Sequence, residues 1–217
     1  MDSYSLKSVS DLPDPFRSTF SFRYFNSLQS ECFSACFHSD INMVISAPTG
    51  SGKTVLFELC ILRLLSKFIS QDGRFVHTKG TLKAIYISPS KALVQEKLRS
   101  WNQKLGSWGK FDSVTRFGIK DGSLSFFSDI SLVLIDEVHL LSDPRGAALE
   151  AIVSRIKMIG RSPQMKSTPL AHVRFLAVSA TIPNIEDLAE MALWFGEGNA
   201  ASVKLNYQVF RVKLPVT

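Results

Sequence analysis

The chain has 217 residues, of which 45% are apolar and 20% charged, so it can form one α/β domain with a full core and is not a disordered protein. The net charge of +6 favours a polyanionic partner, and three irregularly spaced cysteines exclude a disulfide framework. No apolar run reaches the length of a membrane-spanning helix and residues 1–14 carry no signal-peptide pattern, so we expect a soluble intracellular protein without a membrane partner.

The first predicted elements surround a glycine-rich turn. Residues 1–19 are polar and contain two prolines, which predicts a loose lead-in. An aromatic-rich run then passes into a helix predicted over residues 27–37, with Ser27 as its N-cap. Residues 42–46 predict a buried strand, and residues 55–65, which are apolar at helical spacing, predict a helix.

The turn between that strand and that helix has the composition of a phosphate-binding loop, with the residues Ala47, Pro48, Thr49, Gly50, Ser51, Gly52, Lys53 and Thr54. Gly50 and Gly52 allow the backbone to curl so that successive N–H groups point at phosphate oxygens. Lys53 would reach the β- and γ-phosphates, and the Thr54 hydroxyl would ligate Mg²⁺. An ordinary glycine-rich turn is the alternative, which the flanking strand and helix disfavour. The motif therefore predicts a site for a nucleoside triphosphate.

Strands and helices alternate along the rest of the chain. Apolar runs predict strands at residues 82–87, 132–135 and 173–178, and helical spacing predicts helices at residues 91–101, 147–159 and 182–193. One or two short strands are predicted at residues 203–212. This alternation predicts an α/β fold with a three-layer, doubly wound parallel sheet.

Two adjacent carboxylates, Asp136 and Glu137, follow the predicted strand at residues 132–135. Open α/β sheets bind ligands at the carboxyl ends of their strands. There Asp136 would hold Mg²⁺, and Glu137 would orient and deprotonate the water that attacks the γ-phosphate. A surface turn with two solvated acids is the alternative, and the apolar strand before the pair argues against it.

Small hydroxyl residues end the strand at residues 173–178, in the run Ser179, Ala180 and Thr181. Alone they would be ordinary turn residues. At the end of a strand they are placed to hydrogen-bond His139 and Glu137, which would couple the phosphate site to another surface.

These motifs, in this order, resemble the first motor domain of a superfamily 2 DExH-box helicase. Residues 25–29 match the family's upstream element, whose glutamine contacts adenine, and Pro89, Ser90 and Lys91 match its first strand-contacting motif. Arg145-Gly146 followed by Leu149-Glu150 is typical of the Ski-two-like branch. Within that branch the sequence is most similar to the meiotic crossover DNA helicases.

The resemblance implies a RecA-like P-loop NTPase domain over residues 20–217, with ATP and Mg²⁺ as cofactors. Gln29 would contact adenine, and Phe22, Tyr24 or Phe25 would offer an aromatic face, although core packing is the simpler reading of each ring. Ser179 and Thr181 would couple hydrolysis to movement.

The resemblance also implies a nucleic-acid partner, DNA rather than RNA, with 3′ to 5′ translocation in the nucleus. Pro89, Ser90 and Lys91 would contact the nucleic-acid backbone from the outer edge of the sheet, which carries little sequence information. Lys97, Arg99 and Lys104 would extend that patch or form a solvated helix face.

Two departures from the family pattern qualify these expectations. Lys110-Phe111-Asp112 resembles the tail of a further element whose preceding block is missing. A second motor domain, which would supply arginines to the γ-phosphate, is expected but does not follow in this chain. A non-catalytic nucleotide- or partner-binding module is therefore the main alternative, and a small-molecule kinase is a weaker one.

Overall fold

The computed structural model describes residues 5–70, 83–107, 127–138, 144–180 and 207–211, with residues 144–150 and 207–211 described by their backbone alone. The chain divides into two compact units. The first consists of Met1–Asp40, Thr49–Lys79 and Glu96–Asp112, and the second of Ile41–Pro48, Gly80–Gln95 and Ser113–Thr217. No helix in the described part of the chain is long and apolar enough to cross a membrane.

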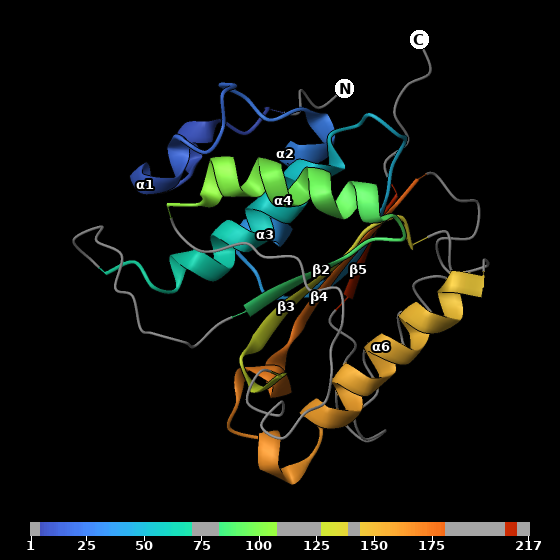
Figure 1. Cartoon of the computed structure of the whole chain (residues 1–217). Helices are drawn as coiled ribbons and strands as arrows, with labels where there is room; N and C mark the ends of the chain where they lie inside the picture. The colour runs from blue at the N-terminus through green and yellow to red at the C-terminus, as the bar shows by residue number, and fades with distance from the viewer. Residues whose placement is uncertain (1–4, 71–82, 108–126, 139–143, 181–206, 212–217) are drawn as a thin grey trace. The chain divides into compact units, whose positions relative to one another are not determined.

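A parallel sheet forms the centre of the second unit (Figure 1). Its strands are β1 (Asn42–Ser46), β2 (Lys83–Ile87), β3 (Ile130–Ile135), β4 (Arg174–Ser179) and β5 (Tyr207–Arg211). They lie in the order β2-β3-β4-β1-β5, and all neighbouring pairs run parallel. Every residue of β4 is buried, as a strand covered on both faces should be. The predicted parallel α/β sheet is therefore confirmed.

Helix α6 (Pro144–Gly160) packs on one face of this sheet with the short helices η3 (Pro163–Met165) and η4 (Pro169–His172) (Figure 1). The strands contribute apolar side chains to this core, and the helices cover them. The principal members are Val44, Val133, Ile135, Phe175 and Ala177 from the sheet and Val153, Ile156, Met165 and Leu170 from the helices. Branched and aromatic side chains of this kind each gain about 1.5–3 kcal/mol when buried. This packing fixes the sheet that carries the carboxylates.

The first unit is helical. Its main elements are α2 (Ser27–Phe37), α3 (Lys53–Ser66) and the part of α4 (Lys91–Leu105) from Glu96 onward. Helices α2 and α3 pack against each other through apolar faces. Cys32 lies in this contact, and burial, followed by the charge of Glu31 and the neighbouring Cys60, raises the pKa of its thiol to about 12. The cysteine therefore acts as a small apolar core residue.

Charged contacts also join the helices of the first unit. Glu58 of α3 is completely buried, and Lys104 of α4 donates to its carboxylate at 2.9 Å. The pair joins α3 to the end of α4. The Lys104 ammonium therefore has an ion-pair partner within the first unit.

Residues 5–19, which belong to the segment expected to be a loose lead-in, contain helical turns and buried side chains. They contain η1 (Val9–Asp11) and α1 (Asp14–Arg17), and Leu12 and Phe16 are buried. Their backbone pairs with the run before α2, since the Val9 N–H donates to the Arg23 carbonyl at 3.0 Å. Val9 is buried as well, so three apolar side chains within eight residues anchor the segment, which its polar composition did not reveal.

Candidate nucleotide-binding site

The phosphate loop leaves the sheet at the end of β1. Ser46 and Ser179 are partners in the β1–β4 register, and the Ala47 N–H donates to the Ser179 carbonyl at 3.2 Å. The Ser46 hydroxyl donates to the Ala180 carbonyl at 3.1 Å. The loop therefore starts at the carboxyl edge of the sheet, as the sequence predicts.

The glycines of the loop adopt the conformation that the motif requires. Gly50 and Gly52 have φ angles of 81° and 82°, in the left-handed region that side chains disfavour. Gly52 is the N-cap of α3, whose first residues are the half-buried Lys53 and Thr54. No described atom lies within 4 Å of the position where a Cβ of Gly50 would be, so the loop has open space there. A 14-residue helix with a bare glycine cap directs its first N–H groups and its positive dipole end outward, which suits a phosphate group.

Gln29 contacts the loop directly. Its Nε2 donates to the Gly52 carbonyl at 3.2 Å, and its Oε1 accepts from the Asn26 N–H at 3.0 Å. Asn26, rather than the predicted Ser27, is the N-cap of α2, because its side chain accepts from the Gln29 N–H and also donates to the Ser51 carbonyl at 2.9 Å. Each amide retains donor and acceptor capacity for a further partner.

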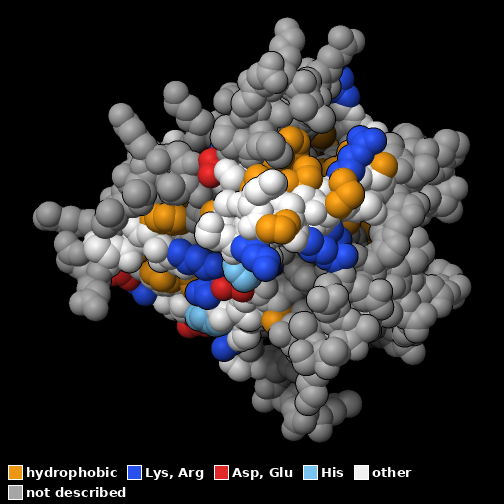
Figure 2. Space-filling model, turned by 90° about the horizontal axis from the view of Figure 1, so that it is seen from below, with side chains coloured by type: hydrophobic (Ala, Val, Ile, Leu, Met, Phe, Trp, Pro, Cys, Tyr) orange, Lys and Arg blue, Asp and Glu red, His pale blue; other side chains and the backbone are white. Residues whose placement is uncertain are grey.

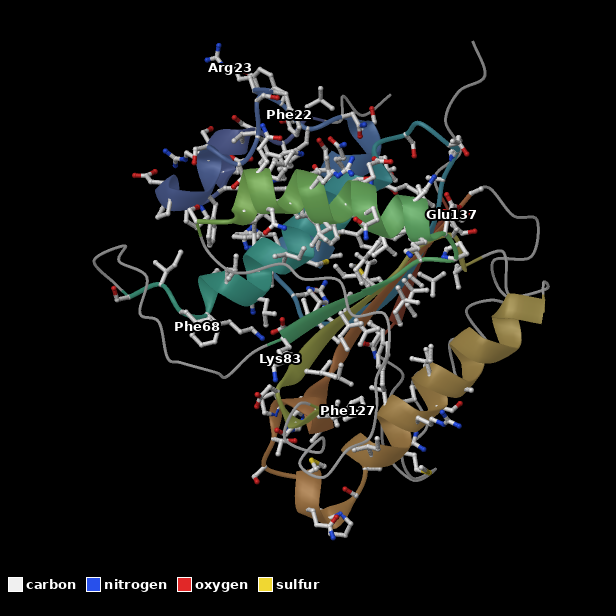
Figure 3. All side chains as sticks on the ribbon, in the orientation of Figure 1. Phe22, Arg23, Phe68, Lys83, Phe127 and Glu137 are labelled. Atoms are coloured by element: carbon white, nitrogen blue, oxygen red, sulfur yellow. The ribbon has the colours of Figure 1, made fainter. Side chains whose placement is uncertain are left out.

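The three aromatic residues expected to offer a face to adenine differ in their burial. Phe25 is completely buried among Phe20, Phe22 and Phe33, so it belongs to the core and offers no face to a base. Phe22 is 37% exposed and Tyr24 is 52% exposed, with the Arg23 guanidinium 5.7 Å from the Tyr24 ring centre. Phe22 and Arg23 are labelled in Figure 3.

The carboxylate pair follows β3 at the carboxyl edge of the sheet. Asp136 extends the ladder, since its N–H donates to the Ile87 carbonyl at 2.9 Å. Its Oδ2 accepts from the Tyr86 hydroxyl at 2.6 Å, and its Oδ1 accepts from the Glu137 N–H at 3.0 Å. Figure 3 shows Glu137 at the end of the sheet opposite to Lys83. The sequence did not single out Tyr86, which is an ordinary strand residue until β2 is known to lie beside β3.

Glu137 has an unusual backbone conformation. It is the one non-glycine residue in the described part of the chain with a positive φ, at 53°. This conformation costs about 1–2 kcal/mol for an ordinary L-residue. Such strained residues cluster at functional sites, where the surrounding structure holds them in place. Val138 is buried in the core beneath the sheet edge and anchors the turn from its other side.

Of the four residues expected to couple hydrolysis to movement, the structure describes Ser179 and Ala180. Ser179 is completely buried, and its hydroxyl has no hydrogen-bond partner among the described residues. The predicted bond between Ser179 and Glu137 is therefore not formed in this structure. His139 and Thr181 lie outside the described residues, as do the predicted helix at 182–193 and the side chains of Arg145, Leu149 and Glu150.

The predicted nucleic-acid contacts follow β2, which is an edge strand of the described sheet. Pro89 and Ser90 are half-buried, and Lys91 is exposed at the start of α4. The Ser90 carbonyl accepts from the Val94 N–H at 3.1 Å, which fixes the first turn of the helix. Figure 2 shows one face of the molecule on which lysine and arginine side chains outnumber carboxylates, in keeping with the net charge of +6.

Comparisons with known proteins bear on this arrangement. A sequence profile described as DEAD/DEAH box helicase matches residues 26–120 and 109–188. A protein of Oryza sativa subsp. japonica named ATP-dependent DNA helicase MER3 homolog is 64% identical over 244 residues, with 96% of this chain and 20% of that protein covered. The ATP-dependent DNA helicase homolog MER3 of Arabidopsis thaliana is 61% identical over 243 residues, with 99% of this chain and 21% of that protein covered. The chain thus spans about a fifth of the length of these curated relatives.

A solved structure supports the fold. Mss116p bound to ssRNA and AMP-PNP matches with a TM-score of 0.66 at 16% identity, covering 89% of this chain and 44% of that one. At this identity the similarity concerns the fold alone. The RecA-like helicase fold that the sequence predicts is thereby confirmed.

The comparisons also bear on the block predicted to be missing before residue 110. The profile gives two separate matches instead of one continuous match, and the two overlap at residues 109–120. The alignment with the rice protein is 244 residues long although this chain has 217, so the rice protein has residues that this chain lacks. Residues 108–126 lie outside the described part of the structure.

Proposed function

Because the chain belongs to the DEAD/DEAH box helicase family, we propose that it is the ATP-binding motor domain of a DNA helicase that acts in meiotic recombination. The observation that carries this proposal is the geometry of the loop, in which two left-handed glycines lead into the bare N-terminus of α3 at Lys53. A turn without a ligand has no need of this arrangement. DNA as the nucleic acid, 3′ to 5′ movement and nuclear localisation extend the proposal by resemblance.

The triphosphate would be held by the backbone of the phosphate loop, which consists of Ala47 and Pro48 in the second unit and Thr49, Gly50, Ser51 and Gly52 in the first, and by the side chains of Lys53 and Thr54. The Lys53 ammonium supplies a positive charge to the β- and γ-phosphates. When bound, Mg²⁺ would offset further phosphate charge, with Thr54 and Asp136 as its protein ligands. Gln29 can contact adenine with the hydrogen-bonding capacity that Asn26 and Gly52 leave unused.

In the second unit, Glu137 is the proposed general base, and the strained turn aims its carboxylate. Tyr86 holds one oxygen of Asp136 and the Glu137 N–H holds the other, so the orientation of Asp136 is set before any ligand binds. Ser179, Ala180, Thr181 and His139 are proposed to couple the site to movement.

Pro89, Ser90 and Lys91 are the proposed contacts to the nucleic-acid backbone. The exposed Lys91 ammonium at the start of α4 is suited to a phosphate group, and contacts to the backbone carry no sequence information directly. Binding through such contacts weakens as the salt concentration rises.

A second candidate function is a non-catalytic nucleotide-binding module. The observation that favours it is the longer alignment with the relatives, since a chain that lacks a block of the domain also lacks the contacts of that block. Under this alternative the 217-residue chain binds nucleotide and does not hydrolyse it faster than a Lys53→Ala variant.

Titration of the chain with a fluorescent ATP analogue tests the proposal. We expect Lys53→Ala to weaken binding about 10- to 100-fold, because it removes a charged hydrogen bond. Lys166→Ala, which truncates an exposed lysine of the second unit, should leave binding unchanged. Equal binding by wild type and Lys53→Ala would refute the nucleotide site. A protein with the missing block and a second motor domain restored should show ATP hydrolysis stimulated by single-stranded DNA, and its absence would refute the helicase function.

A further inference from the structure

We infer that Asn26 is a positioning residue of the phosphate loop, whose side chain aims the backbone N–H groups of the loop at the phosphates. This inference rests on the proposed nucleotide site. Asn26 lies outside the phosphate-loop motif by sequence, 25 residues before Ser51. Neither the pattern of the loop nor the role expected of Gln29 assigns it any part in binding.

The Asn26 side chain joins two elements at once. Its Oδ1 accepts from the Gln29 N–H at 2.9 Å and so caps α2, while its Nδ2 donates to the Ser51 carbonyl at 2.9 Å. An aspartate caps a helix as well as an asparagine does, but it has no donor for a carbonyl. The cap alone therefore does not require the amide, whereas the bond to the loop does.

Asn26 and Gln29 together hold two successive carbonyls of the loop, those of Ser51 and Gly52. In a trans peptide unit the C=O and the following N–H point in opposite directions. A Ser51 carbonyl turned toward α2 therefore turns the Gly52 N–H away from α2, and a Gly52 carbonyl turned toward α2 does the same for the Lys53 N–H. These two N–H groups belong to the set that would bind phosphate oxygens.

The hydrogen bond from Asn26 to the Ser51 carbonyl, called the tether below, matters because the glycines allow the backbone of the loop several conformations. Gly50 and Gly52 both adopt left-handed conformations, and glycine has the largest conformational freedom to lose on ordering. Holding the loop before the ligand arrives removes part of that cost from binding. Asn26 is itself well anchored, since the Phe25 N–H donates to the Lys7 carbonyl at 2.9 Å and the Ser30 N–H donates to the Asn26 carbonyl at 2.8 Å.

Two variants remove the tether and keep the cap. Asn26→Asp retains the oxygen that accepts from Gln29, and Asn26→Ser retains a cap without adding a charge. We expect both to weaken binding of fluorescent ATP and GTP analogues by about three- to tenfold, with melting temperatures close to that of wild type. The two nucleotides should be affected equally, because the tether does not involve the base. Asn102→Asp, on the exposed face of α4, controls for the added charge.

Wild-type affinity in both variants would overturn the inference. An affinity loss that tracks a fall in melting temperature would overturn it too, because Asn26 would then act through the cap alone. The proposed function fails separately if the wild-type chain binds neither analogue, or if Lys53→Ala binds as tightly as wild type. A variant Gln29→Glu that changes the ratio of ATP to GTP affinity, while Asn26→Ser does not, would separate the two roles.

Discussion

The phosphate loop and the carboxylate turn are positioned by different parts of the chain. Side chains at the N-terminal end of α2 hold the loop, through the cap residue Asn26 to Ser51 and through Gln29 to Gly52. The sheet holds the turn, because the Asp136 N–H continues the ladder to Ile87 and Tyr86 of the neighbouring strand fixes its carboxylate. The loop is thus an adjustable backbone held by a few side chains, and the turn is a fixed extension of the core. We expect the loss of a side-chain contact to lower nucleotide affinity at the loop and stability at the turn, whereas a side chain added at a left-handed glycine of the loop should lower stability.

Among the variants that test this comparison, Gly52→Ala should lower the unfolding free energy most. The left-handed φ of 82° and a contact between the new Cβ and the Gln29 Nε2 act together, so we expect a loss of about 3 kcal/mol in unfolding free energy. Gly50→Ala is the matched control, with the same φ but open space, and should cost about 1 kcal/mol. Urea unfolding measures both. Equal losses would mean that the Gln29 side chain yields easily and does not hold the loop.

Tyr86→Phe tests whether the sheet fixes the carboxylate turn. It removes the hydroxyl that donates to Asp136 at 2.6 Å and leaves the ring in place. The expected loss is about 1–2 kcal/mol of unfolding free energy, with little change in nucleotide affinity. Tyr24→Phe, at an exposed ring, should change stability by less than about 0.5 kcal/mol. A loss of affinity without a loss of stability would show that the turn, like the loop, is adjustable.

The smallest expected effect concerns pH and Lys157 of α6, whose Nζ lies 5.9 Å from the centre of the Phe175 ring. Burial, and secondarily the charge of Arg161, lower the pKa of Lys157 from 10.5 to about 7. The unfolded chain then holds the proton more tightly than the folded chain between these values, so this residue makes the unfolding free energy rise as the pH increases from about 7 toward 10.5.

Because Lys157 is only partly buried, we expect that rise to be about 1 kcal/mol. Lys157→Met should flatten it, and the exposed Lys166→Met should not. Urea unfolding at several pH values measures the slope. An unchanged slope in Lys157→Met would assign the pH dependence to other groups.

Local patterns predicted the strands and the motif residues because both depend on neighbours in sequence. The apolar run at 42–46 became β1 (Asn42–Ser46), and the start of the phosphate loop at Ala47 and the Asp136-Glu137 pair lie at the carboxyl edge as expected. Ser27 and Asn26 are equally good caps by type, but only Asn26 has a glutamine three residues on, with which it forms a capping box. Long-range partners escaped prediction. Tyr86 gained its role only once β2 paired with β3.

The burial of residues in the predicted lead-in also depends on long-range contacts. Val9, Leu12 and Phe16 recur at i, i+3 and i+7, but Pro13 and Pro15 interrupt this helical spacing in an otherwise polar run. They are buried because the backbone pairs with Arg23 and because Phe37 of α2 meets the Phe16 ring edge-on at 6.5 Å. A segment can therefore belong to the core although its composition resembles that of a linker.

The buried bond between Glu58 and Lys104 has a mechanical consequence. Removing the cation from a completely buried carboxylate costs several kcal/mol of stability. A movement of α3 that leaves Lys104 behind is therefore unfavourable. Lys104 lies near the end of α4, and Lys91 is the first residue of the same helix. A displacement of α3, the helix that begins with Lys53, would therefore move the C-terminal end of α4 with it.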